Sequence, residues 1–251
     1  MEKFKGWSYD GTRLEDLGFF LTNKNLGLTP GLVAGDLEAD TIEGTIRQES
    51  IYGAREFELT GTLLYPDSCD QPLDYIGQRK VDAQKALSRL FKPFTDKKLV
   101  YGFAPDRYIL CQRVGDIQRK DYINHSEITI RMVAKDPFFY EDQVTIEATN
   151  GTVIELEGNM LTGPKFEISG TINGNRVASP YIEINNLRAE KETAIGPNDT
   201  FIIDSHRRIS AYNKTQTVGF NDKYPILSPG TNIIHTNLES VTIKYRPCWL
   251  T

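Results

Sequence analysis

The chain has 251 residues, a net charge of −5 and a charged fraction of 25%. This length is enough for one large β domain or two small ones, with a substantial buried core in either case. Because acidic and basic residues are mixed along the chain, we expect no basic face that would bind nucleic-acid phosphates. No stretch approaches the roughly 18 consecutive apolar residues that a membrane-spanning helix requires, so no membrane association is expected.

The first ten residues, Met1–Asp10, are polar and aromatic and lack the apolar core of a secretion signal. The three cysteines, Cys69, Cys111 and Cys248, are odd in number and widely separated. Such cysteines are typical of free thiols in a reducing compartment. We therefore expect a protein that folds in a reducing compartment and is not exported by a signal peptide.

The N-terminal part alternates aromatic and polar residues through Phe4, Trp7 and Tyr9. The dipeptide Asp10-Gly11 is typical of a tight turn, and the run Leu17–Leu21 follows it, so a β-hairpin is expected here. Aromatic segments of this kind are also candidates for contacts between subunits.

Residues 33–45 form an acidic segment flanked by glycines, with carboxylates at Asp36, Glu38, Asp40 and Glu43. Such a segment is typical of a solvated loop. The alternative is a surface that faces something that must be kept at a distance.

Residues 57–63 alternate apolar and polar side chains with the period of a half-buried strand, and this strand is a candidate sheet edge. A helix is predicted next, over about residues 72–92. Asp70, Pro72 and Asp74 favour its first turn, and Pro93 ends it. Its apolar residues recur at helical spacing, so we expect it to pack on one face of a sheet. They are Ile76, Ala83, Leu87, Leu90 and Phe91.

Three further strands are predicted at residues 99–103, 108–114 and 127–133. The last of them must end at Asp136-Pro137, because proline has no backbone N–H and the residue before it is biased to an extended conformation. The aromatic run Phe138–Tyr140 cannot face one side of an extended chain, so at least one ring is expected to pack sideways. We interpret this segment as the division between two domains, 1–142 and 143–251; a strand end within a single domain is the alternative.

The second domain is predicted to contain only strands. Asn150-Gly151 is a strong hairpin signal between residues 144–148 and 154–156. Period-two segments separated by turns are typical of an antiparallel β-sandwich. They occur near Phe166, Ile182, Phe201, Ile209 and Val241.

Catalytic and metal-binding patterns are weak. The histidines His125, His206 and His235 have no His or Cys partner at metal-ligand spacing. The tripeptide Asp204-Ser205-His206 contains the residue types of a hydrolase triad, but adjacent residues cannot converge on one another. Glu155 and Glu157 share one strand face, as solvent-facing glutamates commonly do, although a glycosidase pair is the alternative.

Three aromatic residues, Tyr181, Tyr212 and Trp249, could stack on a sugar ring, but such residues more commonly fill a core or an interface. We therefore predict no catalytic, cofactor-binding or metal-binding residues and no enzymatic activity.

The order of these elements resembles the distal tail protein family of long-tailed, non-contractile bacteriophages, over nearly the whole chain. The resemblance rests on the early Gly18-Phe19 run, the strand that closes in 136–140, Asn150-Gly151, Pro164 before a strand, Ile202-Ile203-Asp204, the segment Pro225–Asn232, and the terminal strand through Tyr245-Arg246 and Trp249. In Pro225–Asn232, proline and glycine suit a tight turn, and Asn232 can cap exposed backbone where the next strand begins.

The resemblance implies a mainly β protein with two domains. The first would be a β-sandwich-like, ring-forming domain with one packed helix, and the second a galectin-like antiparallel β-sandwich. Six copies would form a ring at the tail tip of the virion, which is assembled in the host cytoplasm. The acidic residues Asp36, Glu38, Asp40 and Glu43 would line its central channel and would keep passing DNA from binding, an effect that added salt weakens. The ring would join the major tail protein of the tail tube to a tail-associated hub or lysin protein, and would hold baseplate or receptor-binding proteins.

Residues 143–251 suffice for one sandwich without an inserted carbohydrate-binding module, which favours a scaffold. A carbohydrate-binding sandwich for host-surface recognition is the alternative, and a hydrolase is the third hypothesis. Oligomerisation would support the first hypothesis, glycan-dependent retention the second, and turnover of a cell-wall substrate the third.

The predicted division generates a test. Exposed polar linkers between domains are cut preferentially by proteases. We expect limited proteolysis to yield two resistant fragments that meet between Tyr140 and Thr152, identified by mass spectrometry. Cleavage only inside one of the proposed domains, with this window intact, would contradict the division.

Overall fold

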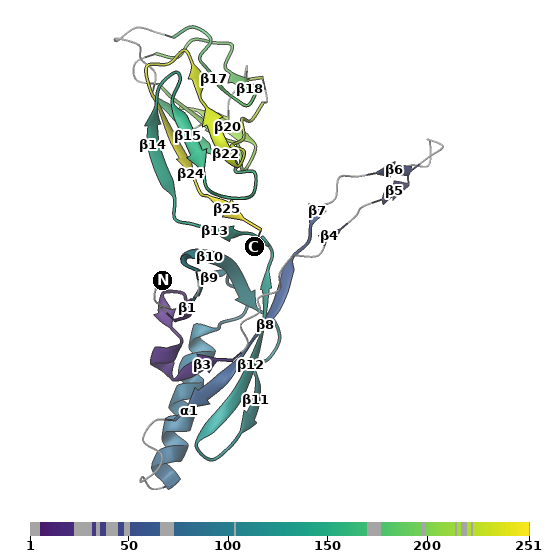
Figure 1. Ribbon diagram of the computed structural model, residues 1–251, viewed down its shortest axis with the longest axis vertical. Helices are drawn as coiled ribbons and strands as arrows, with labels where there is room; N and C mark the ends of the chain where they lie inside the picture. Colours follow the sequence, from purple (N-terminus) through teal and green to yellow (C-terminus); the bar gives the residue numbers. More distant parts are fainter. Residues whose placement is uncertain are drawn as a thin grey trace. The chain divides into compact units, whose positions relative to one another are not determined.

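The computed structural model describes two compact units, residues 1–139 and residues 140–250 (Figure 1). The division lies three residues before the end of the expected first domain at Asp142. The fold is mainly β, as expected, and α1 (Leu73–Leu90) is the only α-helix in the part of the chain that is described. The described residues are 6–22, 32–33, 36–38, 45–47, 51–65, 73–102, 104–169, 177–196, 199–213, 215–216, 220–221 and 223–250.

The first unit is built on a sheet with the strand order β2-β1-β9-β10-β12-β8-β3, and β11 pairs with β12 alongside β10. Strand β10 pairs with β9 through Tyr108–Cys111 and with β12 through Gln112 and Arg113, so it connects the two halves of the sheet. The strands are β1 (Ser8–Tyr9), β2 (Thr12–Arg13), β3 (Phe19–Leu21), β8 (Arg55–Leu64), β9 (Lys97–Tyr101), β10 (Ala104–Arg113), β11 (Gln118–Asp121) and β12 (His125–Ala134).

The longest pairing joins β8 and β12, antiparallel and without a break from Leu64↔His125 to Arg55↔Ala134. Because side chains alternate along a strand, this register places apolar residues on one face and polar residues on the other. The buried face carries Phe57, Leu59, Gly61 and Leu63 of β8 and Ile128, Ile130, Met132 and Ala134 of β12. The predicted strands 57–63 and 127–133 are thus confirmed.

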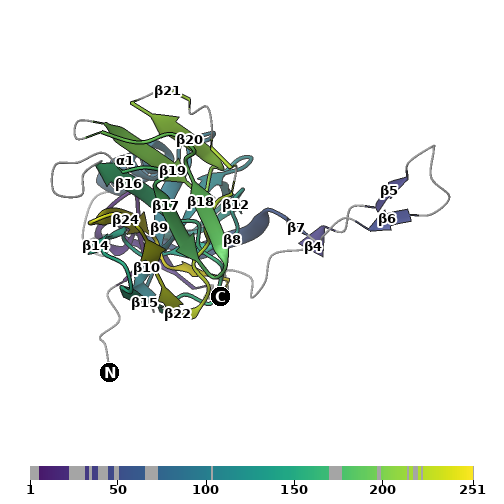
Figure 2. The same cartoon turned by 90° about the horizontal axis from the view of Figure 1, so that it is seen from above.

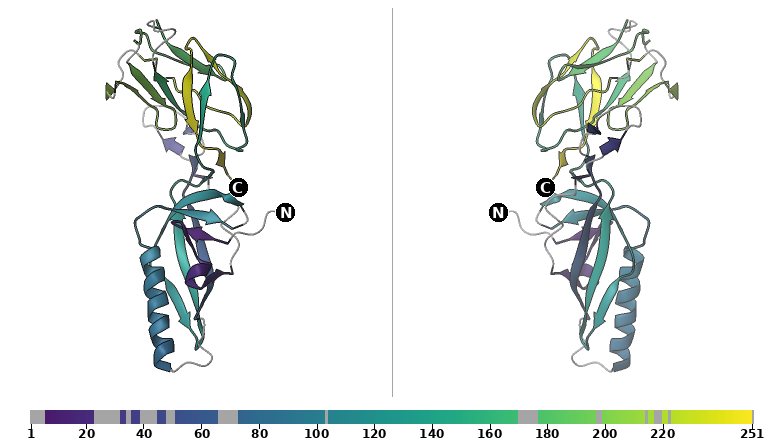
Figure 3. Two further views of the ribbon diagram at one scale, coloured as in Figure 1. Left: turned by 90° about the vertical axis from the view of Figure 1, so that its left-hand side faces the viewer. Right: turned by 90° about the vertical axis from the view of Figure 1, so that its right-hand side faces the viewer.

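Helix α1 agrees with the predicted helix over residues 72–92 and runs along the sheet of the first unit (Figure 3). Leu87 and Phe91 at its C-terminal end are buried, and the Phe91 ring stacks on the Tyr9 ring at 4.5 Å between centroids. Lys80 forms an ion pair with Asp121 of β11 at 3.3 Å. The expected N-terminal signals at Asp70 and Pro72 lie outside the described residues.

The first hairpin is confirmed in part. Strands β1 and β2 pair across Asp10-Gly11, whose φ angles of 52° and 77° are those of the turn expected for this dipeptide. The predicted second strand at residues 17–21 is wrong, because Leu17 belongs to the 3₁₀ helix η1 (Glu15–Leu17) and the strand Phe19–Leu21 pairs with β8 instead of β1. The reason is Gly18, whose φ of 76° ends this turn.

Strand β12 ends before Asp136-Pro137, as predicted. The Asp136 carboxylate accepts a hydrogen bond from the Phe138 backbone N–H at 3.3 Å, which closes a local turn. Phe138 contacts the Tyr52 ring edge-on, and Phe139 lies buried beneath the Arg55 guanidinium, 4.9 Å from the ring centroid. The aromatic run therefore does pack sideways on the first unit.

Two short strand pairs lie between β3 and β8 in the sequence. Strand β4 (Leu32–Val33) pairs with β7 (Ile51–Tyr52), and β5 (Asp36–Glu38) pairs with β6 (Thr45–Arg47). Among the described residues, each pair forms a separate two-stranded sheet. Of the expected acidic loop, Asp36 and Glu38 lie in β5, whereas Asp40 and Glu43 lie outside the described residues.

The second unit is a two-layer β-sandwich. One layer has the order β14-β24-β16-β19-β20-β21, of which β16, β19, β20 and β21 are visible side by side in Figure 2. Except for β25, the other strands form a two-stranded sheet, β15-β22, and a three-stranded sheet, β18-β17-β23. The strands are β14 (Val144–Ala148), β15 (Val153–Leu156), β16 (Lys165–Ser169), β17 (Tyr181–Ile184), β18 (Leu187–Glu190), β19 (Thr200–Asp204), β20 (Ile209–Tyr212), β21 (Thr215–Gln216), β22 (Gly230–Ile233), β23 (His235–Thr236), β24 (Val241–Tyr245) and β25 (Cys248–Trp249); β13 (Phe139–Tyr140) spans the division.

One apolar core joins these layers. It contains Phe166, Phe201 and Ile243 from the six-stranded sheet together with Leu156 and Ile182 from the smaller sheets. The five period-two segments predicted near Phe166, Ile182, Phe201, Ile209 and Val241 all form strands. The expected antiparallel sandwich is therefore observed, and its likeness to galectins stays a prediction.

The hairpin predicted at Asn150-Gly151 is wrong. The dipeptide does form a turn, with Gly151 at a φ of 85°, but β14 pairs with β24 and β15 pairs with β22. The turn is instead bound to the segment that contains Ile234 and Thr236. Gly151 N–H donates to the Ile234 carbonyl, and the Asn150 side chain accepts from Thr236 N–H. Two neighbouring strands therefore enter different sheets.

The segment ending in Asn232 behaves as its residues predict. The fully buried Asn232 side chain accepts from Ser228 N–H at 2.8 Å and donates to the carbonyls of Ser228 and Gly230 at 2.7 and 2.9 Å. Asn185, in the turn between β17 and β18, donates to the side-chain oxygen of Asn232 at 2.9 Å. One amide thus satisfies the backbone of the turn before β22.

This geometry predicts that Asn232→Asp destabilises the second unit by about 2 kcal/mol, because the carboxylate is a near-isostere that cannot donate to the two carbonyls. Thermal unfolding of the full chain would measure the loss. Asn186→Asp, in the exposed turn beside Asn185, is the matched control and should change the melting temperature little. Equal stability of Asn232→Asp and the parent chain would show that this network is not needed.

Candidate functional site

The residue types that could support catalysis are dispersed over the structure. His125 begins β12, where its ring stacks on Tyr122; His206 lies exposed in the β19–β20 turn, and His235 lies in β23. Within the described ranges no three His, Cys, Asp or Glu side chains gather in a group that could hold a metal ion. A search of the same residues finds no helix both long and apolar enough to span a membrane.

The tripeptide Asp204-Ser205-His206 has a structural use in the turn between β19 and β20. The Asp204 carboxylate accepts from Arg207 N–H at 3.0 Å and lies 3.9 Å from its guanidinium. Ser205 is buried and its N–H donates to the Pro164 carbonyl, whereas His206 is exposed. The three side chains therefore do not converge.

Glu155 and Glu157 were the candidates for a glycosidase pair. Glu155 and Glu157 both lie on the exposed face of β15 or just after it, and Glu155 accepts from the Thr231 hydroxyl at 2.7 Å.

The Cys111 thiol is buried, and desolvation, with a smaller contribution from Asp96, raises its pKa well above its usual range. A thiol held neutral in this way is a poor nucleophile.

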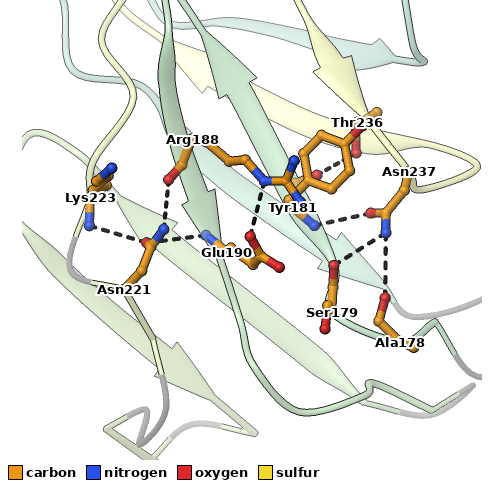
Figure 4. A network of polar contacts seen from close by, with 9 residues as sticks. All are labelled: Ala178, Ser179, Tyr181, Arg188, Glu190, Asn221, Lys223, Thr236 and Asn237. Carbon is orange, nitrogen blue, oxygen red and sulfur yellow. Dashed lines mark hydrogen bonds and ion pairs between the residues drawn. The ribbon is translucent and has the colours of Figure 1, made fainter.

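Two aromatic side chains that could have served as sugar platforms carry cations on their rings. The Arg188 guanidinium lies 3.8 Å from the Tyr181 centroid, and the Lys191 ammonium lies 4.5 Å from the Tyr212 centroid. Figure 4 shows Arg188 over Tyr181, with its Nε donating to Glu190 at 3.0 Å. Each of these cations occupies one face of its ring.

The rest of the network in Figure 4 completes the sheet backbone. Asn237 accepts from Tyr181 N–H and donates to the carbonyls of Ala178 and Ser179. Asn221 accepts from Glu190 N–H at 3.2 Å and donates to the Arg188 carbonyl at 2.7 Å, so it covers part of the outer edge of β18. These amides stabilise the sandwich and leave little room for a ligand role.

A polar surface without an evident internal function lies on the first unit, on the solvent side of the sheet β11-β12-β8-β3. The register brings Thr60 and Thr62 of β8 opposite Thr129 and Glu127 of β12, and the hydroxyl oxygens of Thr60 and Thr129 lie 3.4 Å apart. Arg131 lies 3.9 Å from Glu58 and 4.0 Å from Glu56. All of these side chains are half-buried or exposed. The face is polar, and its opposite charges are close together.

Both edges of this sheet segment are open in the described part of the chain. Strand β3 pairs only with β8, and β11 pairs only with β12. Open strand edges present unpaired N–H and C=O groups, which can pair with a strand of another chain. The segment is therefore suited to continuation by neighbouring copies on either side.

The expected assembly residues need correction. Trp7 and Tyr9 are 2% and 0% exposed, because they pack on Tyr101 and Phe91 in the core of the first unit. The strand near residues 57–63 is not an edge, since β8 has β12 on one side and β3 on the other. Phe4 lies outside the described residues. Period-two patterns alone do not distinguish an edge strand from an interior one.

Comparison with solved structures identifies the fold. No protein-family model matches the sequence, and no curated protein matches it. The crystal structure of the SPP1 Dit protein, described as a paradigm of the hub adsorption apparatus of phages that infect Gram-positive bacteria, matches with a TM-score of 0.74 at 14% identity, over 98% of this chain and 99% of that one. A chain of the phage P2 baseplate in its activated, calcium-bound conformation matches at a TM-score of 0.40 and 11% identity, over 96% of this chain and 97% of that one. The first match shows that the chain has the Dit fold, which confirms the expected fold.

The outer face of the six-stranded sheet of the second unit carries a titratable cluster that generates a test. Glu167 accepts from Lys165 at 2.7 Å and from Lys244 at 2.6 Å, and these hydrogen bonds, first that of Lys165, lower the pKa of its carboxyl group below 4.5. A depressed folded-state pKa contributes stability above the unfolded-state pKa, and this contribution is lost as the pH falls through the folded-state pKa.

We therefore expect Glu167→Gln to lower the free energy of unfolding by about 0.5 kcal/mol at pH 7, since the cluster is partly exposed, and to lower it less at low pH. Chemical denaturation of both chains at pH 7 and near pH 3 would measure this difference. A stability difference that does not shrink on acidification would contradict the assignment.

Proposed function

We propose that this chain is a structural protein of a bacteriophage tail tip. Six copies would form a ring that joins the major tail protein of the tail tube to a tail-associated hub or lysin protein, and that holds baseplate or receptor-binding proteins. The observation that carries the proposal is the whole-length match to the SPP1 Dit fold in both units. Because one fold can serve several functions, the proposal also needs surfaces suited to assembly.

The sheet segment β11-β12-β8-β3 supports a ring. A closed ring requires two different surfaces that meet at each contact, and this segment offers two different open edges, β3 and β11. If neighbouring copies joined these edges, the sheets would continue from copy to copy. Full closure removes every open edge, which is a common solution for exposed strands.

In such a ring the polar face of the segment would line a channel. Its centre carries the threonines Thr60, Thr62 and Thr129, and its charges are of both signs, with Arg131 beside Glu58. A lining of this kind has little net attraction for a polyanion, so DNA could pass without binding. The acidic segment at residues 33–45 was expected to have this role, and it remains a second candidate for the lining.

The short pairs β4-β7 and β5-β6 favour the same assembly. A two-stranded ribbon is marginally stable by itself in water, and these two pairs form separate sheets in the described residues. In the proposed assembly, a neighbouring subunit or a second tail protein would pack against these two pairs. This proposal describes a non-enzymatic component of the virion, located at the tail tip.

The purified full chain should therefore form a closed particle of about six times the 28.4 kDa chain mass, by light scattering and negative-stain imaging. Thr22 N–H donates to the Thr60 carbonyl of β8, so alternation directs the Leu21 N–H to the open edge. Leu21→Pro removes that donor and should dissociate the ring without unfolding the subunit.

Leu21→Ala is the matched control, because it shortens the same side chain but keeps the N–H, and it should retain the ring. Circular dichroism would establish that both variants are folded. A ring of unchanged mass in folded Leu21→Pro would exclude β3 as the joining edge, and a monomeric parent chain at all concentrations would overturn the proposed function.

A further inference from the structure

Phe20 of β3 and Lys120 of β11 lie at the two open edges of the sheet of the first unit, on the same face. The pairs Phe20↔Thr62, Thr62↔Glu127 and Glu127↔Lys120 form one straight row across the four strands. Directly opposite residues of a sheet share a face, so both side chains belong to the polar face. Phe20 is 44% exposed and Lys120 is exposed, so both are accessible to another molecule.

The backbone hydrogen bonds of β3 show which of its groups are directed to the open edge. Thr22 N–H donates to the Thr60 carbonyl of β8. Because the residues of an antiparallel strand alternate in direction, the backbone groups of Phe20 also face β8. Those of Phe19 and Leu21 therefore face the open edge.

The edge at β11 has the same phase. Tyr122 N–H donates to the His125 carbonyl at 2.9 Å, across the hairpin that joins β11 to β12. By the same alternation, the backbone groups of Lys120 face β12. Those of Arg119 and Asp121 therefore face the open edge.

The two edges match in direction and in phase. Strands β3, β8, β12 and β11 alternate in direction, so β3 of one copy would meet β11 of a neighbour in the antiparallel sense. Pairing the outward backbone groups along the straight row places Phe20 opposite Lys120 in a non-hydrogen-bonded pair, where facing side chains come closest. The polar face and the buried face then both continue into the next copy.

The chemistry of the two side chains suits this contact. The Lys120 ammonium lies 5.3 Å from the centroid of the Tyr122 ring in its own copy. A Phe20 ring from the neighbour would offer the same cation a second aromatic face, and such contacts strengthen when water is excluded. The contact would also cover a phenylalanine that is otherwise half exposed at a strand edge.

We propose that Phe20 of one copy packs directly opposite Lys120 of the neighbouring copy, where β3 and β11 join. This inference rests on the proposed ring, and it adds the register at which two copies meet and the side chains that hold it. A slip by one residue would exchange the faces and mismatch the backbone groups. Slips by two residues would instead place Phe20 opposite Gln118 or Tyr122.

Cysteine pairs in the full chain test this register. Within one copy, positions 20 and 120 lie three strand spacings apart, about 14 Å, whereas the Cα atoms of a disulfide lie within about 7 Å. In the proposed contact they would be about 4.5 Å apart. Oxidation of Phe20→Cys/Lys120→Cys should therefore link chains of different copies, seen as a ladder of chain multiples on a non-reducing gel.

Two matched pairs, Phe20→Cys/Gln118→Cys and Phe20→Cys/Tyr122→Cys, face each other only after a slip and should stay unlinked. The parent chain, oxidised alongside, gives the background from the native cysteines. Linking through a slipped pair, or through no pair, in a particle of ring mass would overturn this register and leave the proposed function standing. A monomeric parent chain in light scattering would overturn both.

A truncation tests the aromatic ring itself. Phe20→Ala should weaken association at least about tenfold in analytical ultracentrifugation, because it removes an aromatic anchor and keeps the backbone N–H groups. Leu161→Ala, at an exposed apolar residue of the second unit, is the control and should associate as the parent chain does. Circular dichroism would establish that both are folded. Unchanged association of folded Phe20→Ala would contradict the role given to this side chain.

Discussion

The ten-residue register between β8 and β12 is the constraint on which the first unit depends. A shift of one strand by one residue would exchange the two faces of that strand, and would place its apolar side chains in water and its polar side chains in the core. The register therefore specifies the apolar face together with the polar face. Gly61 reinforces it, because a Cβ at this position would lie 2.4 Å from the Phe20 carbonyl oxygen of the neighbouring strand β3. One set of backbone hydrogen bonds, between β8 and β12, thus fixes two features. These are the apolar side chains that hold α1 and the polar face that is open to other molecules.

The second unit relies on a different device, in which asparagine amides replace missing backbone partners. Asn150, Asn221, Asn232 and Asn237 each bond to backbone groups at a turn or at the end of a strand. An amide carries both a donor and an acceptor, so it can imitate a peptide group where no strand is available. Many short strands thus form one sandwich without long loops that leave buried polar groups unpaired.

Local structure could be predicted from the sequence where one hydrophobic pattern, either period-two alternation or helical spacing, dominates a segment. Period-two patterns identified the strands around Phe166, Phe201 and Val241, and helical spacing identified α1, because each pattern reports only which face is buried. Pairing partners could not be obtained in this way. Residues 144–148 and 153–156 look like a hairpin at Asn150-Gly151, yet each strand pairs with a segment 74 to 101 residues further on, since the choice depends on the common core. Likewise, nothing local separates Trp7, which is buried, from Phe94, which is exposed.

The position of β24 within the second unit has a consequence for the order of events during synthesis. This strand lies between β14 and β16 in the six-stranded sheet, although it is separated from them in sequence by most of the unit. The ribosome must therefore release residues 241–245 before β14 and β16 can be joined into one sheet, whereas the last long strand of the first unit ends at Ala134. The first unit can fold while the second is still being translated, and β14 must wait unpaired until β24 arrives. During that interval, the half-made sandwich is the part of the chain with the greatest need of chaperones.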